Sequence, residues 1–480
     1  MPYLHHLPNE LLITITTYLD TAHDINALAQ ANRHLYTLFN PTLYLHNAKH
    51  QHLSALTWAA RHSILNTAHH AIHASQKTPP TTKLETYHHA LAIAIESGSG
   101  TMPIINLLLS QPGINPNLQL LTEDEEKAGD RLRLTFLARA AQAGNMPALK
   151  RLLPRTSPNS NPPVDPNLGS STGRTPLSYA SSSNHLDAVT YLLSTPGINP
   201  DLRDELYGRT PLSYAADSGA LACVSALLLR PDVDINAAPD PDQCVGIGWT
   251  PLMFATDKMH ISVAKRLLSM PCIDVNYRSK LGETALHLAV LRNLEELVPL
   301  LLARGVDPDI RGPRDATPLF YAAHCGNLSI ARVLCGAGAE PDARTVYRHT
   351  PLREAAVCGW TEIVRFLLAT GRVDVGARDV EAVTVLAAAA MKGSREIVGL
   401  LLGREGGGGK GELGLEARDR QGRNALSYAV GYGDVEIVRM LVEGVEGGVD
   451  LEGVDGVGRT LLSYAPERVR GEMGRVLSGG

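Results

Sequence analysis

The sequence predicts an all-α fold, a solenoid of stacked two-helix units that follows a small module of three short helices. Strings of the type GRTPLSYA recur along the chain, and their spacing never falls below 33 residues. An apolar run at helical spacing follows these strings, and the chain is 44% apolar with only 5% aromatic residues. Small aliphatic side chains suit short helices in close contact, and a solenoid grows by adding units rather than by enlarging one core.

The repeat is clearest in two identical strings, GRTPLSYA at 173–180 and at 208–215. Four consecutive intervals between Thr250 and Thr384 measure 33 or 34 residues. Aligned on the Thr of TPL, the copies start at Ser54, His89, Thr135, Thr175, Thr210, Thr250, Thr284, Thr317, Thr350, Thr384, Asn424 and Thr460. Longer intervals contain inserted loops near 122–134, 154–167, 239–244 and 402–414. We expect these loops to be mobile, since the entropy of loop closure rises slowly with length and long connections are tolerated.

Each unit should form two short helices. The Thr can cap the first helix through its hydroxyl, and the Pro that often follows suits a first helical turn. Glycines then end this helix in several copies, namely Gly144, Gly219, Gly326, Gly359, Gly393 and Gly433. The apolar stripe of the second helix is clear in Ile363, Val364, Leu367 and Leu368, in Ile397, Val398, Leu401 and Leu402, and in Ile437, Val438 and Leu441.

These features resemble the ankyrin repeat, whose signature is TPLHxAA on a 33-residue period. The resemblance covers roughly residues 50–480 and implies helical pairs joined by hairpin loops, with a protein-binding role. The His of the motif is retained only as His287, and Ser stands there in several copies. That exchange should weaken one link between neighbouring loops. The first three copies and the last depart furthest from the pattern, as capping units do.

Residues 7–45 do not fit the repeat and should form short helices of their own. The segment is too small to bury a sufficient core by itself, so it needs the solenoid or a partner. It resembles an F-box in Leu7-Pro8, Glu10-Leu11, Tyr18-Leu19-Asp20 and the 32–36 stretch NRHLY. The resemblance implies contact with a Skp-type adaptor through Leu7, Pro8, Leu11, Leu12, Ile15, Leu19 and Leu28. Ala31 stands where the family often has Val, and a bare cap on the solenoid is the alternative interpretation.

The predicted organisation is therefore an F-box-like module at 1–45, a linker helix with a first degenerate repeat at 46–83, and the remaining repeats, about eleven, at 84–480. As in fungal F-box–ankyrin proteins, this order implies the substrate-recognition subunit of an SCF-type (cullin–RING) ubiquitin ligase. The partners would be the Skp-type adaptor and cullin at the N-terminus and a client protein on the repeats. The alternative is an ankyrin scaffold with no role in ubiquitin ligation.

The sequence contains no motif that indicates an enzyme, a cofactor or a metal. The string GGGGKG (406–411) lacks the spacing of a P-loop, so it is interpreted as an inserted loop. Of 18 histidines 13 precede residue 90, yet His69 and His73 have no third ligand at helical spacing and are expected on a solvated face. Cys325 and Cys358 occupy equivalent positions of adjacent repeats, too far apart for a disulfide and expected to be buried or half-buried thiols.

Composition limits the partners and the compartment. A formal charge of −5 without a long basic tract argues against nucleic acid and anionic membranes. Six cysteines without a CxxC pair, no signal peptide and no run of 18 apolar residues indicate the cytoplasm or the nucleus.

An aromatic ladder marks the candidate client surface. Two residues after the Leu of TPL stand Tyr179, Tyr214, Phe254, Leu288, Tyr321, Tyr428 and Tyr464. The candidate groove comprises Tyr179, Tyr214, Phe254, Tyr321 and Tyr428 with the tip residues Tyr207, Tyr347 and Arg348. Such residues can anchor a partner, but packing between neighbouring first helices is the alternative explanation and the slightly favoured one. Hairpin-tip residues expected at the surface are Asp204, Tyr207, Asp240, Asp242, Arg314, Asp315, Tyr347, Arg348, Asp379 and Glu381, an acid-rich set that predicts a basic partner.

Overall fold

The computed structural model describes residues 54–75, 80–121, 132–153, 163–240, 245–403, 414–444 and 455–478. The F-box-like segment, with Leu7, Pro8, Leu11, Leu12, Ile15, Leu19 and Leu28, lies outside these residues, as does much of each inserted loop. The described chain is helical, and its β-structure consists of two isolated bridges, Leu120 with Leu134 and Arg378 with Thr384. It divides into two compact units, Met1–Gly246 and Ile247–Gly480, which are described separately.

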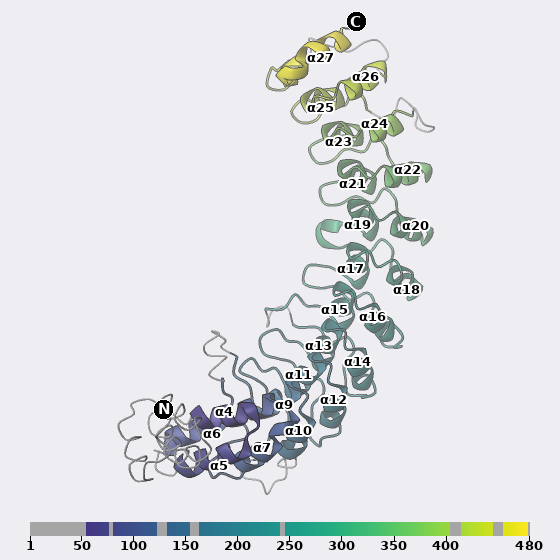
Figure 1. Cartoon of the computed structure of the whole chain (residues 1–480). Helices are drawn as coiled ribbons and strands as arrows, with labels where there is room; N and C mark the ends of the chain where they lie inside the picture. Colours follow the sequence, from purple (N-terminus) through teal and green to yellow (C-terminus); the bar gives the residue numbers. More distant parts are fainter. Residues whose placement is uncertain are drawn as a thin grey trace, which may run out of the picture. The chain divides into compact units, whose positions relative to one another are not determined.

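The first unit consists of consecutive helical pairs (Figure 1). They are α4 (Ser54–His62) with α5 (Leu65–Ala74), α6 (Pro80–Glu96) with α7 (Met102–Leu109), α9 (Phe136–Gln142) with α10 (Met146–Leu152), α11 (Pro176–Ser182) with α12 (Leu186–Leu193), and α13 (Pro211–Asp217) with α14 (Leu221–Leu227). A 3-10 turn, η3 (Ser99–Thr101), precedes α7. Helix α6 starts nine residues before the predicted start at His89 and has 17 residues, so this copy departs from the regular unit.

The second unit continues the same pattern. Its pairs are α15 (Pro251–Asp257) with α16 (Ile261–Leu268), α17 (Ala285–Leu291) with α18 (Leu297–Ala303), α19 (Pro318–Cys325) with α20 (Leu328–Gly336), α21 (Pro351–Cys358) with α22 (Thr361–Ala369), α23 (Val385–Lys392) with α24 (Arg395–Leu401), and α25 (Ala425–Tyr432) with α26 (Val435–Gly444). In the last copy the 3-10 turns η6 (Leu461–Tyr464) and η7 (Glu467–Val469) precede α27 (Arg470–Leu477). Another turn, η5 (Pro313–Asp315), lies in the hairpin before α19.

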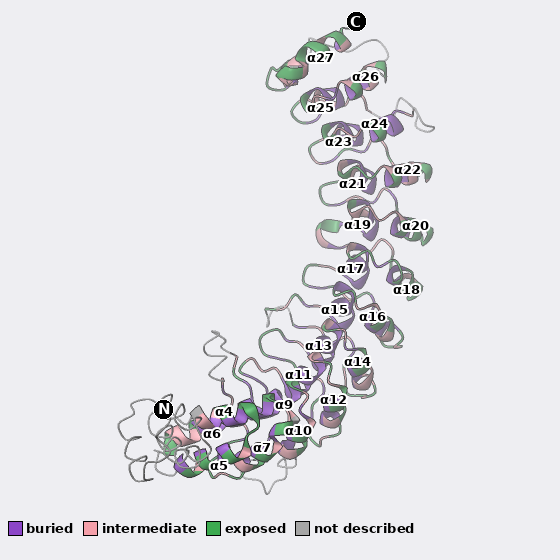
Figure 2. Ribbon diagram, viewed as in Figure 1, coloured by how far each residue is buried: buried purple, intermediate pink, exposed green. Residues whose placement is uncertain are grey.

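Within each unit the helices form two layers (Figure 1). First helices pack on first helices, as α11 does on α9 and α13, and second helices on second helices, as α12 does on α14. The buried positions line the interfaces between the helices (Figure 2). Ala215 and Ala216 are fully buried, which lets neighbouring backbones approach. Ile363, Val364 and Leu367 are buried in the second helix as predicted, and Leu368 is half-buried. The predicted solenoid of two-helix units is confirmed.

The helix starts follow from the Thr of each motif. The Thr175 hydroxyl accepts the backbone N–H of Ser178 at 3.1 Å, and Thr384 does the same for Ala387 at 3.2 Å. Asn424 replaces Thr in one copy and accepts the N–H of Ser427 at 3.0 Å. Thr460 makes no such side-chain bond, and the first helix of its copy shortens to the 3-10 turn η6. The capping prediction is therefore confirmed from Thr135 to Asn424 and wrong for the last copy.

The helix ends depend on glycine for a specific reason. Gly326 and Gly359 end α19 and α21 in the left-handed region, at φ of 80° and 82°. A side chain there costs about 1–2 kcal/mol of backbone strain. The two sites differ in the room they leave for a side chain. A Cβ on Gly326 would lie 2.6 Å from the Trp360 ring, whereas one on Gly359 would meet nothing within 4 Å.

We expect Gly326→Ala to destabilise the second unit by about 1–3 kcal/mol more than Gly359→Ala, since only the former overpacks its site. Moving Trp360 would also break the bond from its Nε1 to the carbonyl oxygen of His324, which measures 2.9 Å. Urea unfolding of the two variants, followed by circular dichroism, measures the difference. Equal losses in the two variants would contradict the packing argument.

Candidate protein-binding surface

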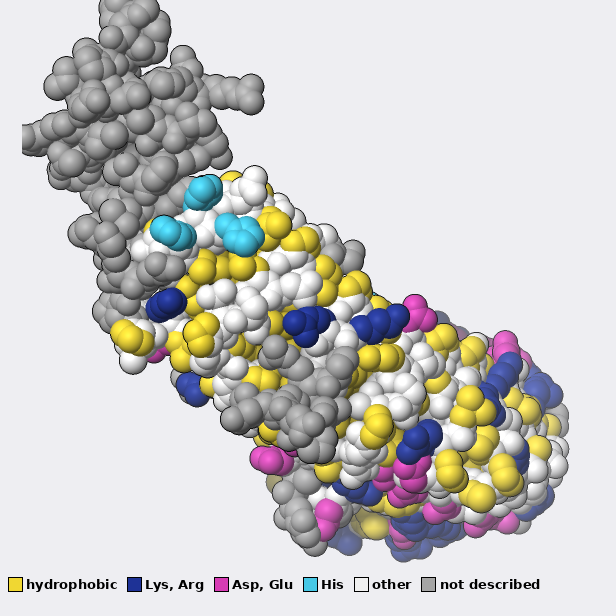
Figure 3. Space-filling model, turned by 90° about the horizontal axis from the view of Figure 1, so that it is seen from below, with side chains coloured by type: hydrophobic (Ala, Val, Ile, Leu, Met, Phe, Trp, Pro, Cys, Tyr) yellow, Lys and Arg dark blue, Asp and Glu magenta, His cyan; other side chains and the backbone are white. Residues whose placement is uncertain are grey.

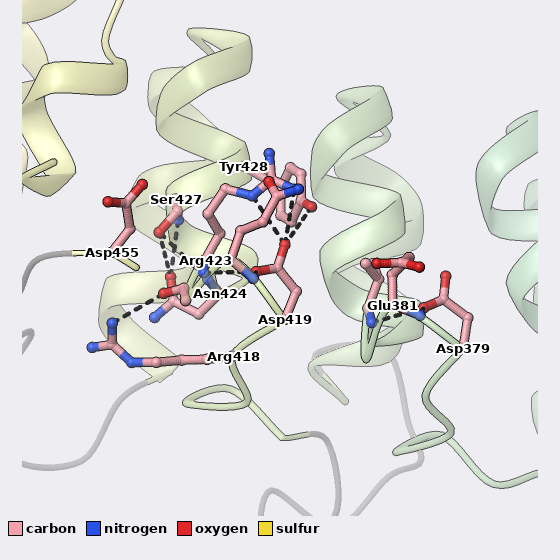
Figure 4. Close-up of polar contacts among 12 residues, drawn as sticks. Asp379, Glu381, Arg418, Asp419, Arg423, Asn424, Ser427, Tyr428 and Asp455 are labelled. Atoms are coloured by element: carbon pink, nitrogen blue, oxygen red, sulfur yellow. Dashed lines mark hydrogen bonds and ion pairs between the residues drawn. The ribbon is translucent and has the colours of Figure 1, made fainter. Parts of the chain in front are cut away.

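The hairpin loop between consecutive pairs, called the finger here, is closed by one carboxylate. Asp419 Oδ1 accepts the backbone N–H groups of Gln421 and Arg423 at 2.8 and 2.9 Å (Figure 4). Its Oδ2 accepts the Tyr428 hydroxyl at 2.7 Å and Nε of Arg423 at 2.9 Å. Tyr428 belongs to the first helix of the same repeat. One aspartate therefore ties the turn of the finger to the helix that follows it.

The same arrangement occurs in other fingers of both units. Asp204 accepts the N–H groups of Tyr207 and Arg209 at 2.6 and 3.0 Å, and the hydroxyl of Tyr214 at 3.0 Å. Asp455 accepts two backbone N–H groups, Nε of Arg459 and the hydroxyl of Tyr464. The sequence signal is Asp, then Gly-Arg three or four residues later, then Tyr nine or ten residues after the Asp.

These bonds also set the charge of the fingers. Burial alone would raise the pKa of Asp419, but hydrogen bonds from Arg423, Tyr428 and Gln421 outweigh it and lower the pKa below its usual value. For Asp455 the hydrogen bond from Tyr464 is the main cause, and the pKa is again lowered. Burial, followed by the bond to Asp419, raises the pKa of Tyr428. Asp419 and Asp455 therefore stay ionised, and Tyr428 stays neutral, near pH 7.

Arginines of the Gly-Arg step cover the tyrosine rings. The guanidinium carbon of Arg423 lies 4.6 Å from the centroid of the Tyr428 ring. Arg174 lies 4.2 Å from the ring of Tyr179 and 3.9 Å from that of Tyr214, so it contacts two successive repeats. Cation–π contacts of this kind are stabilising and hold the rings in one orientation.

The aromatic ladder is therefore largely part of the core. Tyr179 is 2% exposed, and Tyr214 and Phe254 are each 8% exposed. Tyr321 and Tyr428 are half-buried. These rings present little area to a partner, which agrees with the packing interpretation. Tyr207, Tyr347 and Arg348 lie exposed on finger tips, so they are the part of the candidate groove that the surface offers.

The expectation that all the finger residues lie at the surface was wrong for two of them. Asp204 is 3% and Asp379 is 6% exposed. The reason is that each accepts hydrogen bonds from its own finger; Asp379 takes the N–H groups of Glu381 and Val383, both at 2.9 Å. Asp240, Arg314, Asp315 and Glu381 are exposed as expected, and Asp242 lies outside the described residues.

Neighbouring fingers are joined by backbone hydrogen bonds. In the first unit Glu205 N–H donates to the carbonyl oxygen of Thr172 at 2.9 Å. In the second unit Val380 N–H donates to the carbonyl oxygen of Tyr347 at 3.1 Å, and Arg420 N–H donates to the carbonyl oxygen of Glu381 at 3.0 Å. Arg353, at the position of the motif His, adds a 2.8 Å bond to Asp379 of the next finger. The fingers of each unit thus form a connected edge whose tips face solvent.

In the second unit this edge holds an open pocket of about 410 Å³. Its charged lining residues are Arg344, Arg348, Arg378, Arg420, Asp374 and Asp379. Arg344 bonds Asp342 and Asp374 at 3.3 and 3.0 Å. Within the described ranges, Arg348 and Arg378 form no side-chain ion pair. Since arginines outnumber aspartates by two, the pocket favours an acidic group. This contrasts with the basic partner that the finger sequences predicted.

The N-terminal histidines and the cysteines can also be placed. His69, His70 and His73 are exposed on α5, and histidines gather on this part of the first unit (Figure 3). Free thiols are found at Cys223, Cys325, Cys335 and Cys358, and Cys325 is half-buried as expected. Cys358 is exposed, which corrects the expectation of a buried or half-buried thiol; it stands at the end of α21, where the helix meets solvent.

Comparison with known proteins identifies the repeat. A family model described as "Ankyrin repeats (3 copies)" matches residues 91–204, 137–239, 237–312, 264–345, 292–379, 319–412 and 386–477. These matches together cover the chain from residue 91 to 477. The chain belongs to the ankyrin-repeat family. Ankyrin repeats are protein-interaction scaffolds, so the chain has a protein-binding role.

Individual similarities are local. NF-kappa-B inhibitor alpha from Homo sapiens and from Sus scrofa is 42% identical over 59 residues, which is 12% of this chain and 19% of each relative. The match thus spans about a fifth of the relatives' length. The crystal structure of the human ASB11 ankyrin repeat domain aligns with a TM-score of 0.41 and 23% identity, covering 47% of this chain and 97% of that one.

The ankyrin motif His has the role expected of it. His287 is fully buried and Nδ1 lies 2.9 Å from the Thr284 hydroxyl and 3.3 Å from the Thr284 nitrogen, whose N–H it accepts. On its other side a Cβ on Gly312 would lie 2.7 Å from Nε2, so the next ankyrin finger contacts the imidazole. In the described ranges, no helix has both the length and the apolar character to cross a bilayer.

We expect Asp419→Asn to destabilise its finger by about 1–3 kcal/mol, because an amide nitrogen at Oδ2 cannot accept the Tyr428 hydroxyl or the Arg423 Nε–H. Tyr428→Phe removes one of these bonds and should cost about 0.5–1.5 kcal/mol. Hydrogen exchange of the amides of residues 420–424 reports the opening of this finger. Protection that does not change in Asp419→Asn would contradict the role of the carboxylate.

Proposed function

We propose that this ankyrin-repeat protein is the substrate-recognition subunit of an SCF-type ubiquitin ligase. The single observation that supports it is the order of the sequence: the F-box-like strings of residues 7–45 occur in register and are followed by the repeats. In this proposal residues 1–45 bind a Skp-type adaptor and, through it, a cullin. The repeats bind the client.

The adaptor side depends on the apolar residues of the F-box-like segment. Leu7, Pro8, Leu11, Leu12, Ile15, Leu19 and Leu28 are the proposed contacts. A segment of this size cannot bury enough apolar surface alone, so binding to a partner would supply what it lacks. A helical cap on the repeats would use the same residues without a partner, and a scaffold without ligase function is the corresponding second candidate.

The adaptor experiment uses the full chain and a triple variant, Leu7→Ala, Pro8→Ala and Leu11→Ala. Each is purified from cells and the co-purifying proteins are identified by mass spectrometry. Adaptor and cullin should accompany the wild type and be lost from the variant, while the unfolding of the repeats stays unchanged. If neither the adaptor nor the cullin co-purifies with the wild type, the ligase function is rejected and the scaffold is favoured. A variant whose repeats also unfold early would favour the cap.

The client side is assigned to the finger edge of the second unit. Tyr347 and Arg348 are exposed at a finger tip, and Arg348 also lines the arginine-rich pocket. Arginine and tyrosine are residue types that dominate binding energies at protein interfaces. The net positive charge of the lining suits an acidic segment of the client. Tyr207 offers a comparable exposed tip in the first unit.

The client experiment reverses charge in the pocket. Arg348→Glu with Arg378→Glu should reduce the labelling of client proteins in a proximity-labelling experiment while adaptor binding persists. The control adds negative charge elsewhere through Arg475→Glu, an exposed residue of α27. An unchanged client profile in the double variant would place the client on another surface.

We place this function in the cytoplasm, the nucleus or both. The free thiols of Cys223, Cys325, Cys335 and Cys358 support a reducing compartment. Microscopy of the full chain, fused to a fluorescent protein at its C-terminus, tests this proposal.

A further inference from the structure

Three different ligand-type side chains meet on the first-helix layer of the second unit. Glu354 and Cys358 lie four residues apart on α21, and therefore on the same face of that helix. His324 comes from the last turn of the neighbouring helix α19. One donor atom from each lies within 4.8 Å of the other two. This cluster was not predicted from the sequence, because His324 belongs to a different repeat from Glu354 and Cys358.

The distances between the donor atoms fit a tetrahedral metal ion. Nδ1 of His324 lies 2.8 Å from Oε1 of Glu354 and 3.9 Å from Sγ of Cys358, and Sγ lies 4.0 Å from Oε1. Zinc bonds of about 2.0–2.3 Å give tetrahedral edges of about 3.3–3.6 Å. Each observed edge is therefore within about 0.6 Å of the required length. The shortest edge, from Nδ1 of His324 to Oε1 of Glu354, is a hydrogen bond in this structure and has to lengthen by about 0.5 Å to admit the ion.

The surroundings hold the cluster in place. The indole nitrogen of Trp360 donates to the carbonyl oxygen of His324 at 2.9 Å, which fixes the end of α19. The Glu354 side chain is only 13% exposed, whereas that of His324 is 56% exposed. Cys358 is exposed as well. Three donors thus converge from the protein, and the remaining side faces solvent.

The chemistry of the donors selects the metal. One imidazole nitrogen, one carboxylate oxygen and one sulfur form a mixed set that suits zinc, whereas Ca²⁺ and Mg²⁺ prefer oxygen alone. A carboxylate and a thiolate would neutralise a divalent cation. Burial, and then the Glu354 carboxylate, raise the pKa of the Cys358 thiol, so zinc must displace a proton from it.

We propose that His324, Glu354 and Cys358 form a zinc site on the first-helix layer of the second unit, with its fourth position open to solvent. The site is independent of the adaptor and client assignments. Three protein ligands with one open position can accept a side chain of a bound protein as the fourth ligand.

The test uses the full chain under reducing, metal-free conditions with Co²⁺ as a spectroscopic probe, followed by Zn²⁺ in competition with a chromophoric chelator. Cobalt bound to a thiolate gives a charge-transfer band in the near ultraviolet that cobalt bound to histidine alone lacks. We expect one equivalent of Co²⁺ to give this band in the wild type. Cys358→Ser should abolish it, and Glu354→Gln and His324→Gln should weaken zinc binding by at least the roughly 10–100-fold that loss of an outer-shell partner costs.

The matched control is Cys325→Ser, which changes the equivalent cysteine of the preceding repeat and should leave the band intact. Metal-free Cys358→Ser should unfold like the wild type, because the thiol is exposed. Zinc binding without a thiolate band, equal in the wild type and in Cys358→Ser, would assign the metal to the N-terminal histidines and overturn the proposal. Absence of binding would overturn it too.

Discussion

Replacing Glu96 by Ala is expected to destabilise the first unit by about 3 kcal/mol or more, because it removes a carboxylate that pairs with a buried guanidinium. Arg139 on α9 is 1% exposed and is the largest of the fully buried side chains in the described residues. It forms an ion pair with Glu96 on α6, and its second terminal nitrogen donates to the carbonyl oxygen of Leu120 at 2.7 Å. The Glu96 side chain is 41% exposed, so water screens the pair and the loss should lie near the lower end of this range.

Two further variants separate charge from packing. Glu96→Gln keeps an acceptor oxygen and should lose less stability than Glu96→Ala. Combining Glu96→Ala with Arg139→Met removes the buried charge altogether and should recover most of the loss, since apolar replacement of a buried pair is often neutral. Urea unfolding together with hydrogen exchange in α6 and α9 is the appropriate measurement, because repeat proteins open in parts. No recovery in the double variant would show that packing, not charge, is what Arg139 supplies.

The regular part of the fold could be predicted because its determinants are local. The cap of each first helix involves a Thr and an N–H three residues later, and the glycine at its end needs only a left-handed φ. The apolar stripe of α22 is contained in nine residues. The ladder tyrosines were also predictable, since their fixed position in the repeat indicated packing between adjacent first helices as one of two interpretations.

What the sequence did not predict depends on contacts between neighbouring repeats. Arg139 stands in the ladder column, but its partner Glu96 belongs to the preceding, irregular copy, whose helix starts at Pro80. The roles of Asp204 and Asp379 were missed because a polar loop pattern does not say which carboxylate faces inward. A search for Asp followed by Gly-Arg and Tyr would have found Asp204, Asp419 and Asp455, whereas Asp379 has Arg353 of the preceding repeat in place of the Tyr.

The largest expected pH effect concerns His287. Burial lowers the pKa of His287 to about 4 from an ordinary value of 6.5. Between these values the unfolded chain binds a proton that the folded chain does not, so lowering the pH favours unfolding. The contribution of His287 is complete above pH 6.5 and is lost as the pH falls towards 4. A pKa difference of this size between the folded and unfolded states corresponds to about 3 kcal/mol of folding free energy.

The variant that tests this is His287→Ser, because Ser178 and Ser213 occupy the same motif position and place their hydroxyls 3.0 and 3.2 Å from the capping Thr. Losing the imidazole leaves a small cavity, which should lower stability by a similar amount at every pH. The slope of stability against pH is therefore the diagnostic quantity. His88, whose pKa burial also lowers to about 4, titrates in both proteins and cancels in the comparison. Unfolding free energies from urea titrations between pH 7 and pH 4.5 should converge for wild type and variant as the pH falls, and parallel curves would mean that the pKa of His287 is the same in the folded repeat as in the unfolded chain.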